Sequence, residues 1–87
     1  MLQVQIHIRM PKPAPGVRYS SELLDEIADR WLNGEKLPKR IQVTMIEWRS
    51  GRGPWKEERD PRRMNSVRGD FQNMAQAGFR FTGATAV

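Results

Sequence analysis

Arginine and tryptophan gather in one stretch of this 87-residue chain, and their chemistry suits the binding of anions and flat rings. Residues 49–68 hold seven basic and three acidic side chains, a net charge of +4 out of +5 for the whole chain. A guanidinium group binds phosphate through two parallel hydrogen bonds, and an indole ring stacks on a nucleobase. The candidate binding residues are Trp48, Arg49, Arg52, Trp55, Lys56, Arg59, Arg62 and Arg63.

Two structural explanations compete with binding for the same residues. Glu57, Glu58 and Asp60 are interleaved with the cations, so the stretch also fits a solvated surface of mixed charge. The two tryptophans also fit a pair that stabilises a hairpin without any ligand. Trp55 lies between a proline and a lysine at a turn and is predicted to be the more exposed of the two.

Signatures of catalysis and of metal binding are missing from the sequence. His7 is the only histidine, there is no cysteine, and no carboxylate cluster has the spacing of a zinc or calcium site. Neither a nucleophile elbow nor a glycine-rich phosphate loop occurs. We therefore expect a protein that is not an enzyme and that needs no cofactor or metal. A histidine bound to a carboxylate at the floor of a deep pocket would contradict that expectation.

Composition predicts one small globular domain over residues 1–87. Apolar residues make up 38% of the chain and charged residues 29%, which is typical of a folded and soluble protein. No apolar run approaches the roughly 18–20 residues that span a bilayer. The first ten residues alternate in polarity and so do not resemble a signal peptide. The resulting expectation is a cytoplasmic protein without a membrane partner.

The arginines and tryptophans must be positioned by a strand and a turn in the middle of the chain. Residues 41–48 begin with strand-like alternation, with Ile41, Val43 and Met45 on one face. The alternation then fails, because Ile46 and Trp48 fall on the opposite face. Either a β-bulge re-aims the end of the strand, or that face carries an apolar patch. After the turn, residues 55–58 are expected to return as a short edge strand.

Two helices and two further strands complete the prediction. Residues 2–10 alternate as a strand, residues 21–33 form an amphipathic helix capped by Ser20 or Ser21, and Asn33-Gly34 ends it. A second helix spans 61–77, beginning at Asp60-Pro61 or alternatively at Ser66. Residues 79–82 form a last strand. The predicted core is Val4, Ile6, Ile8, Leu24, Ile27, Val43 and Phe71.

The element order β-α-β-β-α-β resembles the split βαβ, ferredoxin-like sandwich. That resemblance implies an α+β fold with an antiparallel sheet and two helices on one face, and it implies no particular function. RNA-recognition domains share this order and carry stacking aromatics on two central strands. Here the fragment Gly78–Phe81 falls in the last strand, and the first strand offers Gln5 and His7 instead. A conventional RNA-recognition domain is therefore not predicted.

Two functions fit the sequence. One is a small nucleic-acid-binding module, such as an accessory protein of a virus or mobile element, with DNA and RNA both open as ligands. The other is a protein-interaction module that acts as an assembly subunit, a homo-oligomer or an inhibitor. This second hypothesis is based on the apolar patch of Ile46 and Trp48 at the end of the central strand, together with an edge strand that is able to pair.

Overall fold

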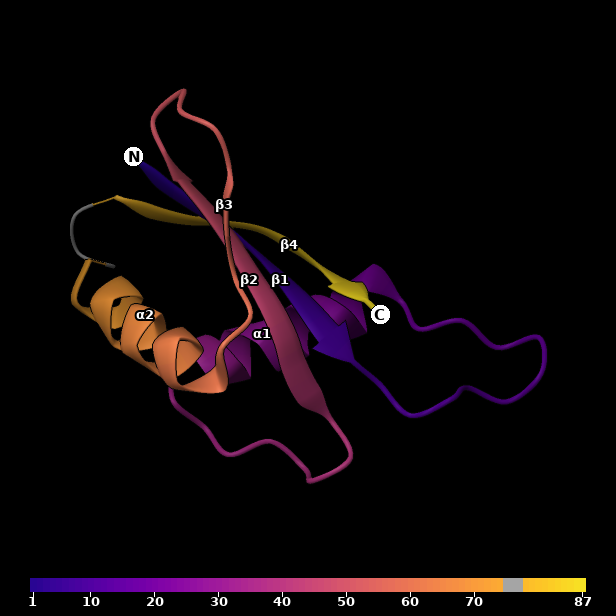
Figure 1. The fold of residues 1–87 in the computed structure, drawn as a ribbon. Coiled ribbons are helices and arrows are strands. Elements are labelled where there is room, and N and C mark those ends of the chain that lie inside the picture. The colour runs from indigo at the N-terminus through magenta and orange to yellow at the C-terminus, as the bar shows by residue number, and fades with distance from the viewer. Residues whose placement is uncertain (75–77) are drawn as a thin grey trace.

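A computed structural model of the chain describes residues 1–74 and 78–87. Six elements follow one another, and Figure 1 shows their arrangement. They are β1 (Leu2–Arg9), α1 (Ser21–Leu32), β2 (Gln42–Ser50), β3 (Lys56–Glu58), α2 (Pro61–Met74) and β4 (Phe79–Ala86). The predicted order of helices and strands is thereby confirmed, including the short returning strand.

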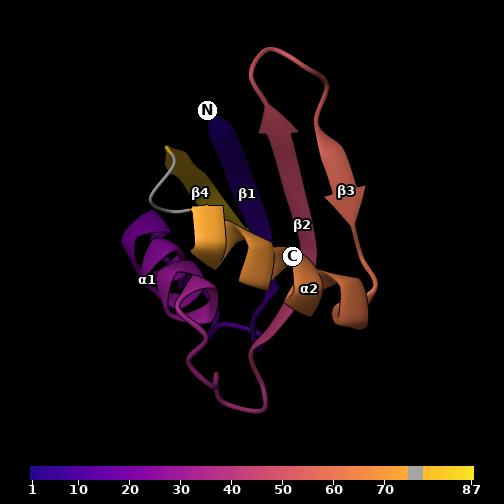
Figure 2. The same ribbon diagram turned by 90° about the vertical axis from the view of Figure 1, so that its left-hand side faces the viewer.

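The four strands form one sheet in the order β3-β2-β1-β4, and both helices lie in front of it in Figure 2. This confirms an α+β fold with two helices on one side of a four-stranded sheet. β1 and β2 are neighbours, as predicted, and pair antiparallel. One face of the sheet is covered by helices, and the other face is open.

The prediction that the sheet is antiparallel throughout is wrong for one pair, because β4 runs parallel to β1. The reason lies in the connection through α2. β3 has the same direction as β1, since two antiparallel pairings separate them. The 14 residues of α2 carry the chain back along the sheet, so β4 starts at the same end as β3. The mixed sheet is compatible with a ferredoxin-like type of α+β fold.

A β-bulge at Thr44 explains the broken alternation of β2. His7 pairs with Met45, whereas Ile8 pairs with Val43, so Thr44 is an extra residue opposite β1. Its hydroxyl donates a hydrogen bond to the carbonyl oxygen of His7 at 2.9 Å. Of the two sequence alternatives, the bulge is therefore the one that occurs.

Because of the bulge, the apolar side chains before and after Thr44 point to the same face of the sheet. Val43, Ile46 and Trp48 all pack towards the helices. Met45, which we assigned to the same face as Val43, pairs with His7 on the open face instead. The apolar patch formed by Ile46 and Trp48 is consequently not on the open face.

Helix α1 has the ends that its sequence predicts. Ser20 is the N-cap, and its hydroxyl accepts the N–H of Leu23 at 3.1 Å. At the other end Gly34 has a φ of 84°. The N–H of Gly34 bonds to the carbonyl of Trp31, and the N–H of Glu35 bonds to that of Arg30, both at 3.0 Å. These two bonds form a Schellman motif.

Helix α2 begins at Pro61 rather than at Ser66. The carboxylate of Asp60 caps it by accepting the N–H of Arg62 at 2.9 Å, and the N–H of Met64 bonds to the Asp60 carbonyl at 2.8 Å. Residues 75–77, where we predicted the last turn of this helix, lie outside the described residues. Gly78 follows with a φ of 97°.

The core lies between the helices and the covered face of the sheet. Val4, Ile6, Ile8 and Ile46 are wholly buried, and the helices contribute most of the remaining buried residues: Leu24, Ile27, Ala28, Trp31, Leu32, Met64 and Phe71. Six of the seven predicted core residues are buried as expected. Val43 is only half-buried, because it lies where the sheet ends beside the bulge.

Candidate functional site

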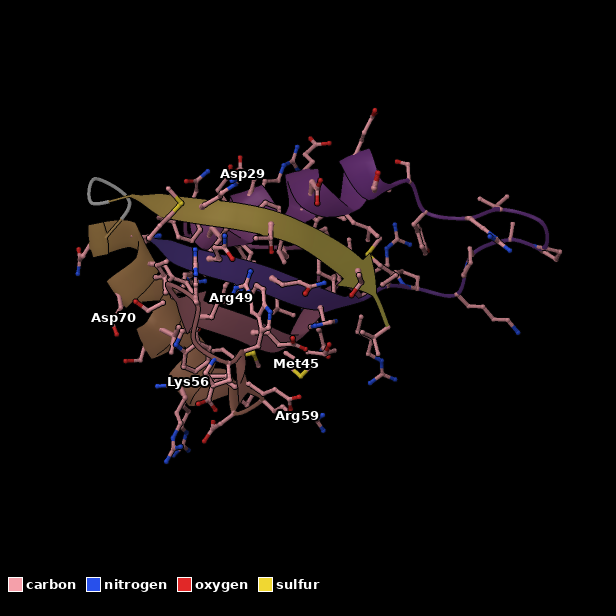
Figure 3. All side chains as sticks on the ribbon, turned by 90° about the horizontal axis from the view of Figure 1, so that it is seen from above. Asp29, Met45, Arg49, Lys56, Arg59 and Asp70 are labelled. Carbon is pink, nitrogen blue, oxygen red and sulfur yellow. The ribbon has the colours of Figure 1, made fainter. Side chains whose placement is uncertain are left out.

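The open face of the sheet gathers the polar side chains of three strands. Val4, Ile6 and Ile8 point to the helices, so Gln3, Gln5 and His7 point the other way. Across the sheet they meet Arg49 and Glu47 of β2 on one side and Arg80 and Thr85 of β4 on the other. Figure 3 shows the sheet from above and labels Arg49, Met45 and Arg59.

Arg49 and Trp55 lie together at one end of this face, where β1 begins and β2 ends. The guanidinium carbon of Arg49 lies 4.7 Å from the centre of the Trp55 ring, which is a cation–π contact. The Nε of Arg49 donates a hydrogen bond of 2.7 Å to the side-chain oxygen of Gln3. Gln3 thus holds the guanidinium group through Nε, and among the described residues no carboxylate lies within ion-pair distance of Arg49. Trp55 is half-buried rather than fully exposed, because Arg49 covers part of it.

A polar hollow of about 470 Å³ adjoins this pair. Its lining comprises Gln3, Gln5, Arg49, Trp55, Arg80, Phe81 and Thr82. The volume is in the range of pockets that hold small ligands. Two guanidinium groups, two amides and an indole ring therefore border one space.

A second β-bulge shapes the far side of the hollow. Val4 pairs with Phe81 and Gln5 pairs with Gly83, so Thr82 is an extra residue of β4. Its hydroxyl donates to the carbonyl oxygen of Val4 at 2.8 Å. Gly83 has a φ of 145°, which a residue with a Cβ seldom adopts. The bulge thereby keeps Arg80 on the open face and returns Ala84 to the helix side.

His7 occupies the other end of the face and is bonded on both sides. Its Nε2 lies 2.9 Å from Oε1 of Glu47, and its Nδ1 lies 2.7 Å from the hydroxyl of Thr85. This meets half of our sequence-based criterion for an enzyme, namely a histidine held by a carboxylate. The adjoining hollow is only about 220 Å³, and Thr85 is exposed. No deep pocket surrounds this histidine in the described part of the chain.

Two glutamates face each other across β2 and β3, and each contacts a different basic side chain. Glu47 pairs in register with Glu57. Like charges at opposite positions repel, which weakens a sheet. Here His7 contacts Glu47, while a guanidinium nitrogen of Arg59 lies 3.4 Å from Glu57. Arg59 is therefore engaged with a neighbouring carboxylate.

The remaining predicted cations lie away from the hollow. Arg52 is exposed in the turn between β2 and β3, and Arg62 and Arg63 are exposed in the first turn of α2. Lys56 lies opposite Trp48 and so belongs to the helix side of the sheet. The structure thus brings Arg49 and Trp55 together and leaves the others around one edge.

Trp48 contributes to the core and not to the open face. It is half-buried and packs against the cluster of buried side chains. It does not pair with Trp55, because the two rings belong to opposite faces. The predicted pairing of the two tryptophans across the hairpin therefore does not occur, and Trp48 packs on the core instead.

Sequence reasoning missed Gln3, Gln5, Arg80 and Thr82 as parts of this site. The signal for the first two was the polar side of the alternating first strand, residues 2–10. Arg80 carried a weaker signal. It lies between Phe79 and Phe81 in a predicted strand, so the alternation of side chains puts it on the opposite face from the two phenylalanines. Its partners come from strands more than thirty residues distant, and only the parallel pairing of β4 with β1 reveals them.

Metal and membrane features complete the description. The residues that the structure describes contain no group of three His, Asp or Glu side chains arranged to hold a metal ion. Over the same ranges, no helix has both the length and the apolar character needed to cross a bilayer. No protein-family model, no curated protein and no solved structure matches this chain.

Proposed function

We propose that this protein is a small, non-enzymatic module that binds single-stranded nucleic acid on the open face of its sheet. The observation that carries the proposal is the half-buried Trp55, which lies under Arg49 at the rim of the polar hollow. An indole ring gives a base a stacking platform, and this contact contributes about 1–3 kcal/mol. Cytoplasmic residence and an origin in a virus or mobile element stay predictions from the sequence.

Phosphate binding is the second part of the proposal. The terminal nitrogens of Arg49 and the guanidinium group of Arg80 border the same hollow as Trp55, so one nucleotide could meet both a ring and a cation there. Gln5 offers a neutral amide donor and acceptor in the same space. Because none of these groups reads a base pair from a groove, a flexible single strand suits the face better than a duplex does.

The exposed arginines at one edge of the sheet would provide further phosphate contacts for a bound nucleic-acid strand. Arg62 and Arg63 lie in the first turn of α2, where a positive charge opposes the helix dipole. Within the described residues neither arginine has a carboxylate within ion-pair distance. A bound phosphate would offset this unfavourable placement, and the later helix start that also explained it does not occur.

The interaction hypothesis is weaker in the form that the sequence suggested. It was based partly on a patch of Ile46 and Trp48, but Ile46 is wholly buried and Trp48 packs on the core. Its other basis, an edge strand able to pair, stays a prediction, with β3 at one edge of the sheet.

The test is a fluorescence anisotropy titration with labelled single-stranded and double-stranded DNA and RNA. Trp55→Ala should weaken single-strand binding by about 1–3 kcal/mol, the cost of one lost stacking contact. Arg49→Gln and Arg80→Gln should each lower the slope of log affinity against log salt by about 0.7, the value for one phosphate of a single strand.

Arg30→Gln is the matched control for the charge variants. Arg30 lies on α1, on the covered side of the sheet, and is paired with Glu26 at 3.1 Å. Its replacement removes one charge without touching the open face, so the salt slope should stay unchanged. If micromolar protein does not bind single strands at about 50 mM salt, the proposal is wrong.

A further inference from the structure

An apolar hollow of about 570 Å³ lies where the loop between β1 and α1 passes the end of β4. Figure 1 shows this loop reaching out from the body beside the C-terminus. Val17 and Val87 line the hollow and are 54% and 73% exposed, which makes them two of the four large apolar side chains exposed in the described ranges. Met10, Tyr19 and Leu24 also line it. Apolar exposure concentrated in a concave site is typical of a binding surface.

The outer edge of β4 borders this hollow, and the described residues provide no hydrogen-bond partner for one outward backbone N–H on that edge. The N–H of Val87 points inward and donates to the carbonyl of Ile8 at 2.8 Å. The N–H of Ala84 points outward and donates to Oδ1 of Asp25 at 3.0 Å. Because strand residues alternate, Ala86 also points outward, beside the hollow that it lines. Among the described residues, no acceptor corresponding to Asp25 forms a hydrogen bond with the N–H of Ala86.

The charge at the rim of the hollow is positive. Lys12 and Arg18 both line it and both are exposed. Within the described ranges, no carboxylate lies within ion-pair distance of either. An occupant with apolar groups for the floor and negative charges for the rim is therefore complementary to this site.

We propose that the edge of β4 at Ala86, together with this hollow, binds an extended acidic peptide that adds a strand to the sheet. In strand addition the backbone bonds supply affinity, and pockets for alternate side chains supply specificity. The peptide backbone bonds to the outward N–H and carbonyl of Ala86. Its apolar side chains enter the hollow, and its acidic side chains meet Lys12 and Arg18. This site is separate from the Arg49–Trp55 face and does not depend on nucleic-acid binding.

The first experiment uses a labelled peptide of about six residues, the usual length of a strand, that alternates valine and aspartate. Its binding is followed by fluorescence anisotropy. Ala86→Pro removes only an outward N–H, which an edge strand tolerates, and should weaken binding about fivefold, as expected for one hydrogen bond. Ala86→Ser is the matched control, because it keeps the N–H and should bind as the natural chain does.

The charge contribution is tested separately. Lys12→Gln and Arg18→Gln should each weaken binding about twofold to fivefold at low salt, which is the range for exposed ion pairs. As controls, Lys36→Gln and Lys39→Gln each remove one positive charge from the loop before β2. They should leave the affinity for the peptide unchanged. Circular dichroism of each variant shows whether it is folded. If Ala86→Pro does not fold, the same peptide with its alternate amides methylated tests the bond on the natural chain.

Several outcomes would overturn the proposal. One is equal affinity for Ala86→Pro and Ala86→Ser, or for the methylated and unmethylated peptides. A second is a site that binds decanoate and rejects the peptide, since the hollow would then take a small amphiphilic acid. A third is self-association in sedimentation that Ala86→Pro abolishes, without peptide binding, which would make a second copy of the chain the occupant. Absence of any peptide binding would also overturn it.

Discussion

At the scale of single residues, Arg49 is the side chain on which the candidate site depends. Its guanidinium group is bonded to Gln3 through Nε and lies over the ring of Trp55. Both contacts restrict the long arginine side chain before any ligand arrives. A guanidinium group that is already oriented loses less conformational entropy when it binds phosphate, so Gln3 acts as a positioning residue.

Replacement of Gln3 by methionine separates positioning from charge. Methionine has a similar volume but cannot accept the hydrogen bond from Arg49. We expect Gln3→Met to weaken single-strand binding about fivefold, the equivalent of one hydrogen bond, while the salt slope stays unchanged because no cation is lost. Anisotropy titrations over a salt series measure both quantities. A fall in the slope equal to that of Arg49→Gln would show that Gln3 has another role.

At the scale of elements, two β-bulges decide which residues reach the open face. Thr44 of β2 and Thr82 of β4 are each an extra residue opposite β1, and each hydroxyl donates to a β1 carbonyl. Each bulge reverses the facing of the residues that follow it. The composition of the open face and of the core therefore depends on the same two bulges.

Two deletions in β2 should differ sharply in their cost. Without Thr44 the strand alternates regularly, and Val43, Ile46 and Trp48 still face the helices. Without Glu47, Trp48 turns to the open face and Arg49 turns into the helix side. We expect the Thr44 deletion to cost no more than about 2 kcal/mol of the free energy of unfolding, in the range of ordinary mutations. The Glu47 deletion should cost at least about 3 kcal/mol, because it buries an unpaired charge. Urea unfolding measures both, and similar values would contradict the assigned register.

The start of α2 gives a second prediction at this scale. Asp60 caps the helix through the N–H of Arg62. Asp60→Ala should lower the free energy of unfolding by about 1 kcal/mol, whereas Asp60→Asn, which keeps a capping oxygen, should lose much less. Thermal and chemical unfolding can compare the two variants. Equal losses would mean that the charge of Asp60, and not its cap, stabilises this end of the helix.

At the scale of the whole molecule, the two helices and the sheet enclose one core and leave two surfaces that we propose for binding. The open face carries Arg49 and Trp55, and the edge of β4 carries the apolar hollow. Asp25 of α1 accepts a hydrogen bond from the outward N–H of Ala84 in β4, so helix packing also closes part of that edge. Both surfaces therefore depend on the same packed core.

Truncation within that core should destabilise the entire molecule. Ile27 of α1 is 7% exposed and packs with the buried residues of β1. Ile27→Ala should cost about 2–5 kcal/mol, the usual range for removing a large buried side chain. Urea unfolding is the measurement, with Leu23→Ala as the control, since Leu23 is 39% exposed on the same helix. A loss below about half a kilocalorie for Ile27→Ala would mean that the buried stripe of α1 is misassigned.

The sequence by itself determined the elements and most of the core. Caps at Ser20 and Asp60, the glycine after α1 and the apolar periodicities depend on nearby residues, so they can be read locally. The same local signals found Arg49 and Trp55, which lie near each other in the chain.

Only the tertiary structure decided the facing of Met45 and Trp48, the direction of β4 and the membership of Gln3 and Arg80 in the candidate site. A bulge in this strand could be proposed from the sequence, but it could neither be chosen over its alternative, which had the same residue pattern, nor be located at Thr44. The parallel pairing of β4 with β1 joins residues that are more than seventy positions apart, and no local pattern encodes such a pairing. Register across a sheet is fixed by which faces are buried together, and burial is a property of the assembled fold.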